Sequence, residues 1–342
     1  MKGRHLVSTI TLAASLIVAI PLAHAASGPN SYAVQSHEVL FNGLSHVSGI
    51  RRSTCTGRAW HAAVSNVNGT IVKAYGAPYY PPAEFELPMN GAQALARAIT
   101  DLSAGRQVRL HTQVHVAAFD QSTPEWTNLG DSELAYFEFP KLDANSKSGG
   151  YFKMAVVPTT FTPMADKLAG TSAPVAAPAP VFLANGFVVT IPGLDCTRVM
   201  SVDGIRIGGS ADAGSSVASG EFADARPSAE SRNGNITIRA TAVTGRGLHD
   251  WMLANQTGGP TKREITIQLV SASGAQPLLT LHGVGVGLMS VMPDPAVSEG
   301  IPIWTATLFV ERWEVTAPGG PGMVRGKVDL AAPGFGIPVG RK

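Results

Sequence analysis

Two histidines and a glutamine that could contribute to a metal site recur at every second position of one predicted strand. They are His111, Gln113 and His115, and their alternation with apolar residues places all three on one face of the strand at 108–116. Two histidines four residues apart on a strand lie too far apart to hold one ion unless further ligands come from elsewhere. We therefore expect this face to be a polar surface or to line a lumen.

Other motifs with catalytic associations lack the residues that their chemistry requires. The segment Gly283–Gly287 is rich in glycine, but no Lys-Ser or Lys-Thr follows it and it lies between strands, so it is not a phosphate loop. We expect a strand that needs close backbone approach, or a bulge. The segment Gly208–Asp212 lacks the Gly-x-Ser-x-Gly order of a nucleophile elbow and is predicted to be a loop.

The acidic pairs also predict no catalytic centre. Glu84 with Glu86, and Asp131 with Glu133, share strand faces on which we expect them to be solvated. The sequence thus predicts no catalytic, cofactor-binding or metal-binding residue, and a protein that is not an enzyme. A hydrolase with an unrecognised site is the third of three alternatives.

Aromatic residues offer the best sequence signal for ligand binding. Tyr75, Tyr79 and Tyr80 precede two prolines, and rings on an open loop could stack on a sugar. Trp304 and Trp313 fall in a predicted strand. We expect core packing for the tryptophans and a proline-stiffened loop for the tyrosines.

The N-terminus has the order of a secretory signal peptide. Lys2 and Arg4 precede a mostly apolar run at 6–20, and Ala-His-Ala ends at Ala25. The run is short and interrupted by hydroxyl residues, whereas a membrane span needs about 20 apolar residues. We predict cleavage near Ala25 and a mature protein without a membrane span, secreted or at the cell surface, with the periplasm as an alternative.

Charge and cysteine content fit an exported protein. Removing Lys2 and Arg4 leaves 26 − 2 = 24 basic residues against 24 acidic ones, so no basic field attracts nucleic acid. Low net charge also favours self-association. An oxidising compartment makes a disulfide between Cys55 and Cys196 possible, within or between chains, with two buried free thiols as the alternative.

A Pro/Ala-rich stretch divides the mature chain into halves of similar size. We predict a first domain at 31–166, a linker at 167–180, a second domain at 181–317 and a Gly/Pro-rich C-terminal arm at 318–342. The arm has no core of its own and is expected to be disordered alone or ordered against a partner.

The two predicted domains contain similar elements in a similar order. The matched strands are 38–44 with 187–194, 84–87 with 235–238, 108–116 with 263–269, and 151–157 with 303–310, and Val47–Ile50 matches Val202–Ile205 as a Val-x-Gly-Ile turn. Each half has one short predicted helix between its second and third matched strands, at 91–102 and around 247–253, ending near Gly105 and Gly258. These patterns predict a mainly β fold of two tandem small barrels or sandwiches, each with one short flanking helix.

The order of these elements resembles the tail-tube protein family of contractile phages, which is related in fold to the Hcp tube protein of type VI secretion. The resemblance covers most of 185–316 and, more faintly, 36–162. The residues that carry it are Phe187–Leu194, Val202–Ile205, Leu248–Trp251, Lys262–Leu269 with Gly274, and Trp304–Trp313. Members of that family usually have one such domain and no export signal, so this chain departs from the pattern in both respects.

The resemblance implies self-assembly. In that family a small barrel pairs edge strands with its neighbours to close a six-membered ring, and rings stack into a tube. Three chains with two copies each would form a pseudo-sixfold ring, with the chain itself as partner. The alternative from another class is a monomeric secreted binding protein or adhesin with two β-sandwich domains.

Overall fold

The computed structural model describes residues 36–41, 45–47, 49–54, 59–67, 70–117, 125–164, 182–209, 233–274, 276–294, 302–318 and 327–328. The predicted signal peptide, the linker at 167–180, Cys55 and most of the C-terminal arm lie outside these residues.

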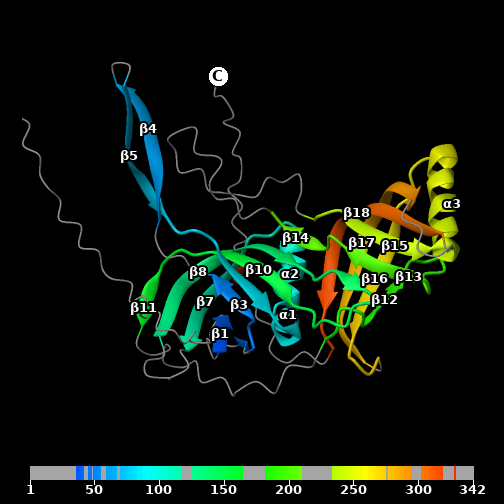
Figure 1. Cartoon of the computed structure of the whole chain (residues 1–342), viewed down its shortest axis with the longest axis horizontal. Coiled ribbons are helices and arrows are strands. Elements are labelled where there is room, and N and C mark those ends of the chain that lie inside the picture. Colours follow the sequence, from blue (N-terminus) through cyan, green and yellow to red (C-terminus); the bar gives the residue numbers. More distant parts are fainter. Residues whose placement is uncertain are drawn as a thin grey trace, which may run out of the picture. The chain divides into compact units, whose positions relative to one another are not determined.

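The protein is mainly β, with two barrel-like sheets and few helices, as predicted (Figure 1). Its first sheet has the strand order β2-β1-β7-β8-β10-β6-β3, and β11 pairs with β8. These strands are β1 (Ser36–Phe41), β2 (Ser45–Val47), β3 (Arg52–Thr54), β6 (Ala83–Leu87), β7 (Val108–Ala117), β8 (Glu125–Glu138), β10 (Phe152–Val157) and β11 (Thr162–Met164). We call residues 36–164 the first half.

The second sheet has the strand order β12-β16-β17-β18-β15-β13-β9. Its strands are β9 (Leu142–Asp143), β12 (Phe187–Thr190), β13 (Val199–Asp203), β15 (Ile236–Thr241), β16 (Arg263–Val270), β17 (Pro277–Pro293) and β18 (Ile303–Thr316). Buried and half-buried residues alternate along β15, as expected of a strand with one face in the core. We call residues 182–318 the second half.

Three further strand elements complete the described β structure. Strands β4 (Ala59–Val67) and β5 (Thr70–Tyr79) form a hairpin and, among the described strands, pair only with each other (Figure 1). Strand β19 (Lys327–Val328), which belongs to the predicted C-terminal arm, pairs antiparallel with β7 at Arg109 and Val108. Strand β14 (Arg206–Gly208) belongs to the second half by sequence but pairs with β8 of the first sheet.

The two sheets have the same strand order. Read from β1 and from β12, the orders are β1-β7-β8-β10-β6-β3 and β12-β16-β17-β18-β15-β13. In both halves, helical structure lies between the same two strands, β6 and β7 in the first half and β15 and β16 in the second. The strand pairs matched in the sequence therefore occupy equivalent positions in their sheets.

Both long central strands, β8 and β17, are interrupted at equivalent places. One extra residue, Ala135 on β8, shifts the pairing with β10, and Met289 on β17 shifts the pairing with β18 in the same way. A second shift on the opposite edge of each strand lies beside a glycine with positive φ, Gly130 at 68° and Gly285 at 69°. Bulges are specific features that families retain, so their coincidence is informative about how the halves are related.

The first half has two consecutive helices where one was predicted. Helix α1 (Met89–Ala94) and helix α2 (Ala96–Ser103) meet at Leu95, whose ψ of 0° interrupts the α-helix. The predicted packed face is confirmed, because Leu95, Ile99 and Leu102 are buried. Gly105 has a φ of 81° just beyond α2, as expected of a helix stop.

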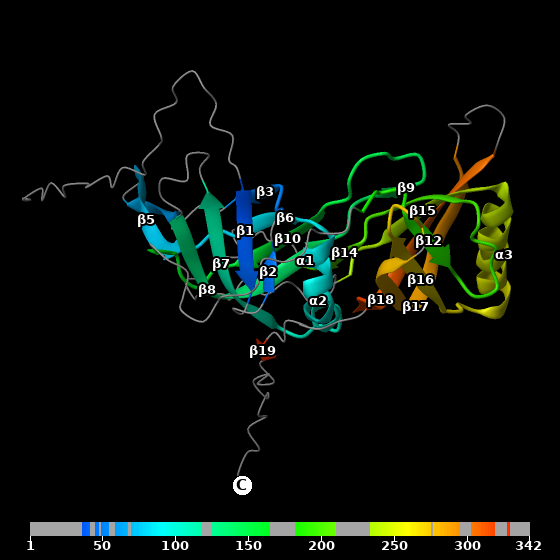
Figure 2. The same ribbon diagram turned by 90° about the horizontal axis from the view of Figure 1, so that it is seen from below.

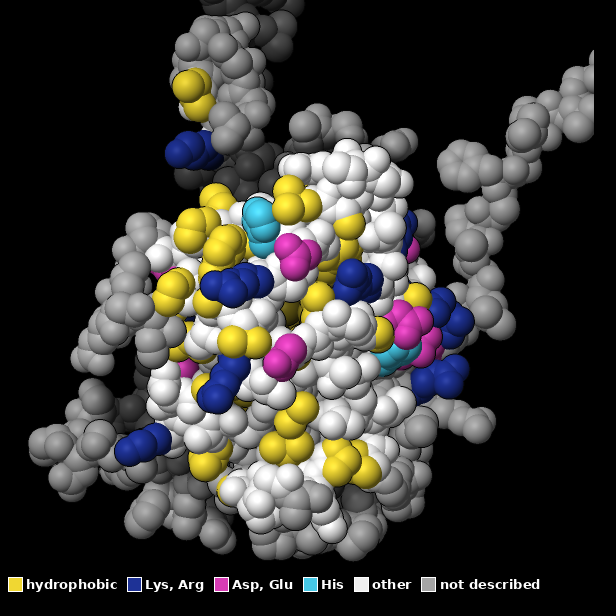
Figure 3. Space-filling model, turned by 90° about the vertical axis from the view of Figure 1, so that its right-hand side faces the viewer, with side chains coloured by type: hydrophobic (Ala, Val, Ile, Leu, Met, Phe, Trp, Pro, Cys, Tyr) yellow, Lys and Arg dark blue, Asp and Glu magenta, His cyan; other side chains and the backbone are white. Residues whose placement is uncertain are grey.

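The second half has a helix longer than predicted. Helix α3 (Ala242–Gly258) begins before Gly245 and Gly247. Because glycine has a low helix propensity, the sequence pattern did not predict the first turn of this helix. Gly245 is required there, because a Cβ atom would lie 2.3 Å from the Trp304 side chain. The helix ends at Gly258, close to the predicted stop, and Gly259 beyond it has a φ of 87°. On the side of the molecule shown in Figure 3, hydrophobic side chains lie among sparse charged ones.

Of the sequence interpretations of two glycine-containing motifs, one is confirmed and the other is wrong. The expected close backbone approach at Gly283–Gly287 is confirmed, since a Cβ atom at Gly287 would lie 2.1 Å from the Phe309 ring. The match between the two Val-x-Gly-Ile turns is wrong. Val47 on β2 pairs with β1, whereas Val202 on β13 pairs with β15, so similar local sequences serve different strands.

Candidate functional site

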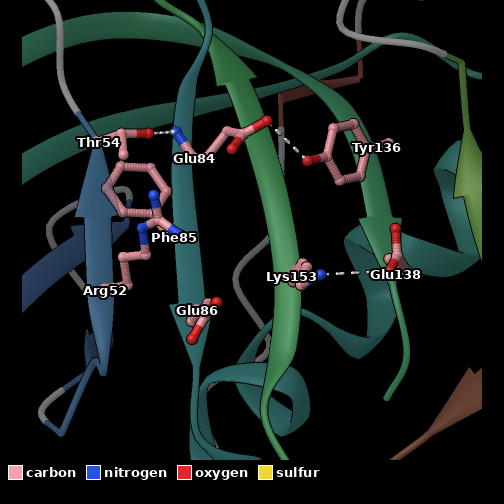
Figure 4. A pocket seen from close by; sticks show the side chains of 8 residues that line it. All are labelled: Arg52, Thr54, Glu84, Phe85, Glu86, Tyr136, Glu138 and Lys153. Carbon is pink, nitrogen blue, oxygen red and sulfur yellow. Dashed lines mark hydrogen bonds and ion pairs between the residues drawn. The ribbon is translucent and has the colours of Figure 1, made fainter. Parts of the chain in front are cut away.

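A charged pocket lies on the first sheet, where four neighbouring strands present polar side chains (Figure 4). The alternation along β6 points Glu84 and Glu86 to this face, while Phe85 between them is buried. Strands β3, β8 and β10 supply the rest. The residues that line the pocket are Arg52, Thr54, Glu84, Phe85, Glu86, Tyr136, Glu138 and Lys153.

The surroundings of Tyr136 in this pocket shift the pKa of its phenol. Its hydroxyl donates a hydrogen bond of 3.0 Å to Oε1 of Glu84. Burial, together with the Glu84 carboxylate, raises the pKa of Tyr136 to about 12. The Arg206 guanidinium, carried by β14, lies 4.1 Å from the centroid of the same ring. Tyr136 therefore keeps its proton at neutral pH.

Glu138 of the pocket is paired with two cations. Nζ of Lys153 lies 3.9 Å from Glu138 Oε1, and Nη1 of Arg206 lies 3.8 Å from Glu138 Oε2. Oγ1 of Thr54 accepts a hydrogen bond from the Glu84 backbone N–H. Glu138 thus lies between Lys153 of β10 and Arg206 of β14, and these charges form a junction between β8, β10 and β14.

The raised pKa of Tyr136 has a measurable consequence. Because the pKa of Tyr136 is about 12 in the folded protein and about 10 for an ordinary tyrosine, the folded state holds the proton more tightly. This stabilisation is present below pH 10 and is lost as the pH rises towards 12. In a near-ultraviolet titration, Tyr136→Phe should remove the phenol that ionises last and leave the lower transition unchanged. Loss of signal from the lower transition would contradict the assignment.

A second junction joins α2 to the edge of β18. Strand β15 pairs with β18 only at 303–308, so the backbone beyond that point needs other partners. Thr100 Oγ1 accepts a hydrogen bond of 2.8 Å from the Val315 N–H, and Ser103 Oγ accepts one of 2.6 Å from the Trp313 N–H. Gln93 of α1 donates to the Leu278 carbonyl at 2.8 Å. Side chains of α1 and α2 in the first half thus form hydrogen bonds with a strand edge of the second half that β15 leaves unpaired.

The two halves also exchange strands. Strand β14 of the second half adds to β8 at Tyr136–Glu138, and β9 of the first half adds to β13 at Ser201 and Val202. Figure 2 shows α2 next to β14 and β18, consistent with the contacts of α2 with both strands. Gly208 permits the close approach of β14, because its φ is 100° and a Cβ atom would lie 2.3 Å from the Ala135 carbonyl oxygen.

The strand face predicted to be a polar surface or lumen lining is only partly exposed, and two of its three residues have local partners. Nδ1 of His111 lies 3.1 Å from Asp131 Oδ1, and the His115 ring stacks on Trp126 with the centroids 4.6 Å apart. Gln113 is buried. Within the part of the chain that the structure describes, no three His, Cys, Asp or Glu side chains are grouped closely enough to hold a metal ion.

Of the acidic pairs, Glu84 is exposed, as expected, and the other three residues are half-buried. Glu84 is engaged by Tyr136 as described, and Glu133 accepts a hydrogen bond of 2.7 Å from Gln107. Among the aromatic candidates, Trp313 is fully buried, as predicted for core packing, whereas Tyr75 is 86% exposed.

The second cysteine lies at the margin of the core. Cys196 packs against the hydrophobic core cluster, and burial raises the pKa of its thiol. Because Cys55 lies outside the described residues, the disulfide between them stays a prediction.

Solved structures similar to part of this chain come from tube-bearing assemblies. The tube-terminating cap of the anti-feeding prophage is 17% identical over 44% of this chain and 99% of its own, with a TM-score of 0.29. The sheath–tube complex of an extracellular contractile injection system in the extended state contains a chain that is 22% identical over 42% of this chain and 94% of its own, with a TM-score of 0.28. The sheath/tube terminator of such a system is 26% identical over 42% and 99%, with a TM-score of 0.31. Neither a family model nor a curated protein matches the chain.

The residues that join the halves were not identified from the sequence. Tyr136 and Arg206 lie in segments without a strong strand pattern, and Thr100 and Ser103 lie in an alanine-rich helix. Two hydroxyl residues on the inner side of such a helix are a usable signal, because a buried hydroxyl requires a hydrogen-bond partner. Among the described helices, none combines the length and the apolar character needed to cross a membrane.

Proposed function

We propose that the mature chain is an exported structural protein that assembles with itself into a ring, tube or filament outside the cytoplasm. Each chain would contribute two tandem tube-like domains, at 31–166 and 181–317, joined by the linker at 167–180. Three chains would form a ring of six similar units. The protein would have no catalytic role.

The common plan of the two sheets supports a tandem duplication. They have the same strand order and the same location of helical structure, and the bulges at Ala135 and Met289 interrupt equivalent strand pairs. Independent origin of two such sheets would require each of these features to arise twice.

The docking of the first half on the second half carries the proposal. One surface of the first half, formed by α2 and the β8 edge, contacts a different surface of the second half, formed by β18 and β14. A contact between unlike surfaces of similar units is heterologous, and repeating it generates a ring when the rotation closes and a filament when it does not. The contact inside one chain is thus a template for contacts between chains.

The predicted signal peptide, the C-terminal arm and the two cysteines each have a role in this proposal. The signal at 1–25 would direct export and be removed near Ala25. The arm at 318–342 would reinforce the assembly by adding to strand edges, as Lys327–Val328 does on β7 within the chain. A disulfide between Cys55 and Cys196 would add a covalent link.

Imaging tests this proposal. Residues 26–342 would be purified and examined by negative-stain electron microscopy and by light scattering over a range of concentrations. We expect rings or hollow filaments with three- or sixfold symmetry and masses that are multiples of three chains. Uniform monomers at high concentration would overturn the proposal and favour a monomeric secreted binding protein or adhesin with two β-sandwich domains.

A further inference from the structure

The second half has an exposed apolar surface beside α3 and the end of β17. Val243 and Leu253 on α3 are 56% and 45% exposed, and Met289 and Met292 on β17 are 52% and 59% exposed. We call these four residues, together with the backbone edge of β17 at Ser290–Met292, the open face. In the first half, the structurally equivalent surface is covered by the second half.

The helices of the two halves can be aligned by their buried residues. Aligning Leu95 with Leu248 also aligns Ala98 with Trp251, and all four are buried against their own sheets. Gly91 and Ala92, which are buried, then align with Thr244 and Gly245, which are also buried. The same side of each helix therefore packs on its own sheet.

This alignment shows which positions differ between the helices. Ser103 is buried in the contact with β18, and Thr100 is half-buried there. Their counterparts, Gln256 and Leu253, are exposed. Thr100 and Ser103 lie on the side of α2 that faces the other half, and among the described residues nothing covers the equivalent positions of α3.

The β17 edge gives an independent correspondence. The shared bulge aligns Tyr136–Glu138 of β8 with Ser290–Met292 of β17, and β14 pairs with the first of these edges. Strand β16 pairs with β17 only as far as Val286, so no described strand pairs with this edge at 290–292. An edge with exposed methionines and no partner strand is suited to pairing with another chain.

We propose that the open face binds the first half of a second copy of this chain. This inference rests on the proposed function and names the surfaces that the assembly uses. The occupant follows from the contact within the chain, where the equivalent surface of the first half receives the second half. In the contact between copies, the open face of the second half takes the part that the equivalent surface of the first half takes within the chain. The first half of another copy binds to this open face, as the second half binds within the chain.

Strands β10 and β11 form the partner surface on the second copy. Together they run along β8 as β18 runs along β17, and β11 corresponds to the part of β18 that α2 covers. Thr162 and Pro163 of β11 are exposed and Met164 is half-buried. Strand β11 of one copy would therefore lie against the exposed side of α3 of its neighbour.

Two acidic substitutions on the open face test the proposal. Leu253→Asp and Met292→Asp are exposed changes that should leave the circular dichroism spectrum and the melting temperature unaltered. Each should weaken assembly of residues 26–342 at least tenfold in a sedimentation titration. Val188→Asp, at a position on β12 that is 48% exposed and outside the open face, is the matched control and should assemble normally.

A mixing experiment identifies the partner surface. Thr162→Arg on β11 should also give monomers, because it disables the opposite surface of the chain. A mixture of Leu253→Asp with Thr162→Arg retains one functional surface of each kind and should form a dimer of one copy of each variant that grows no further. If the unmodified chain assembles and Leu253→Asp assembles equally well, the open face is not the contact and the proposed function stands. If each variant is monomeric and the mixture forms no dimer, the pairing with β11 is wrong. If the unmodified chain is monomeric, both proposals fail.

Discussion

Replacing Trp313 with alanine should lower the free energy of unfolding by about 3–5 kcal/mol, the cost of removing a large buried aromatic side chain. Trp313 is completely buried on β18. It packs over Gly283, where a Cβ atom would lie 3.0 Å from the indole. Its backbone also joins the halves through Ser103, so a collapse around the cavity would disturb that junction. Urea denaturation of the variant and the unmodified chain measures the difference.

Phenylalanine at the same position is the matched control. The indole Nε1 of Trp313 is buried and has no hydrogen-bond partner among the described residues, so Trp313→Phe loses no described hydrogen bond and keeps most of the ring volume. We expect it to cost less than half as much as the alanine variant. Equal losses for the two variants would mean that the cavity is not the cause.

Replacing Gly208 with alanine should destabilise the protein by about 2–6 kcal/mol. Of this, about 1–3 kcal/mol comes from a positive φ at a residue with a Cβ atom and about 1–3 kcal/mol from overpacking. The methyl group would lie 2.3 Å from the Ala135 carbonyl oxygen and 3.0 Å from Leu102. Relief would require β14 to move away from β8, which would also separate Arg206 from Tyr136. Hydrogen exchange of the β8 amides at 136–138 should accelerate.

Gly274 supplies the control for this second variant. Its φ is 71°, but no atom lies within 4 Å of the position that a Cβ atom would take. Gly274→Ala therefore carries only the backbone cost, about 1–3 kcal/mol, and should leave exchange in β8 unchanged. A Gly208→Ala variant no less stable than Gly274→Ala would show that β14 tolerates displacement.

The sequence was sufficient to predict the elements with strong local patterns. The alternation in Ile236–Thr241 and the apolar face of Leu95, Ile99 and Leu102 are local signals, and both lie where they were expected. Strand β8 was not recognised as one long strand because Asn128, Gly130 and Asp131 have low strand propensity. It is a strand because neighbours pair with both of its edges, which is information that lies outside the segment.

The site was harder to predict than the fold for the same reason. Glu84 was identified, but its partner Tyr136 lies 52 residues away, and no periodic pattern connects them. The three residues of β14 are too few to give a periodic signal. Contacts between halves depend on how sheets dock, whereas sequence patterns report only the preferences of each segment.

The exchanged strands have a consequence for the order in which the chain folds. When the first half leaves the ribosome, the β8 edge at 136–138 lacks its partner strand until β14 has emerged. During that interval an exposed edge is open to strands of other nascent chains, the route by which domain swapping and aggregation begin. The risk lasts until β8 and β14 are both present in the same chain. The strand that joins the halves would thus tie correct folding of the first half to the synthesis of the second.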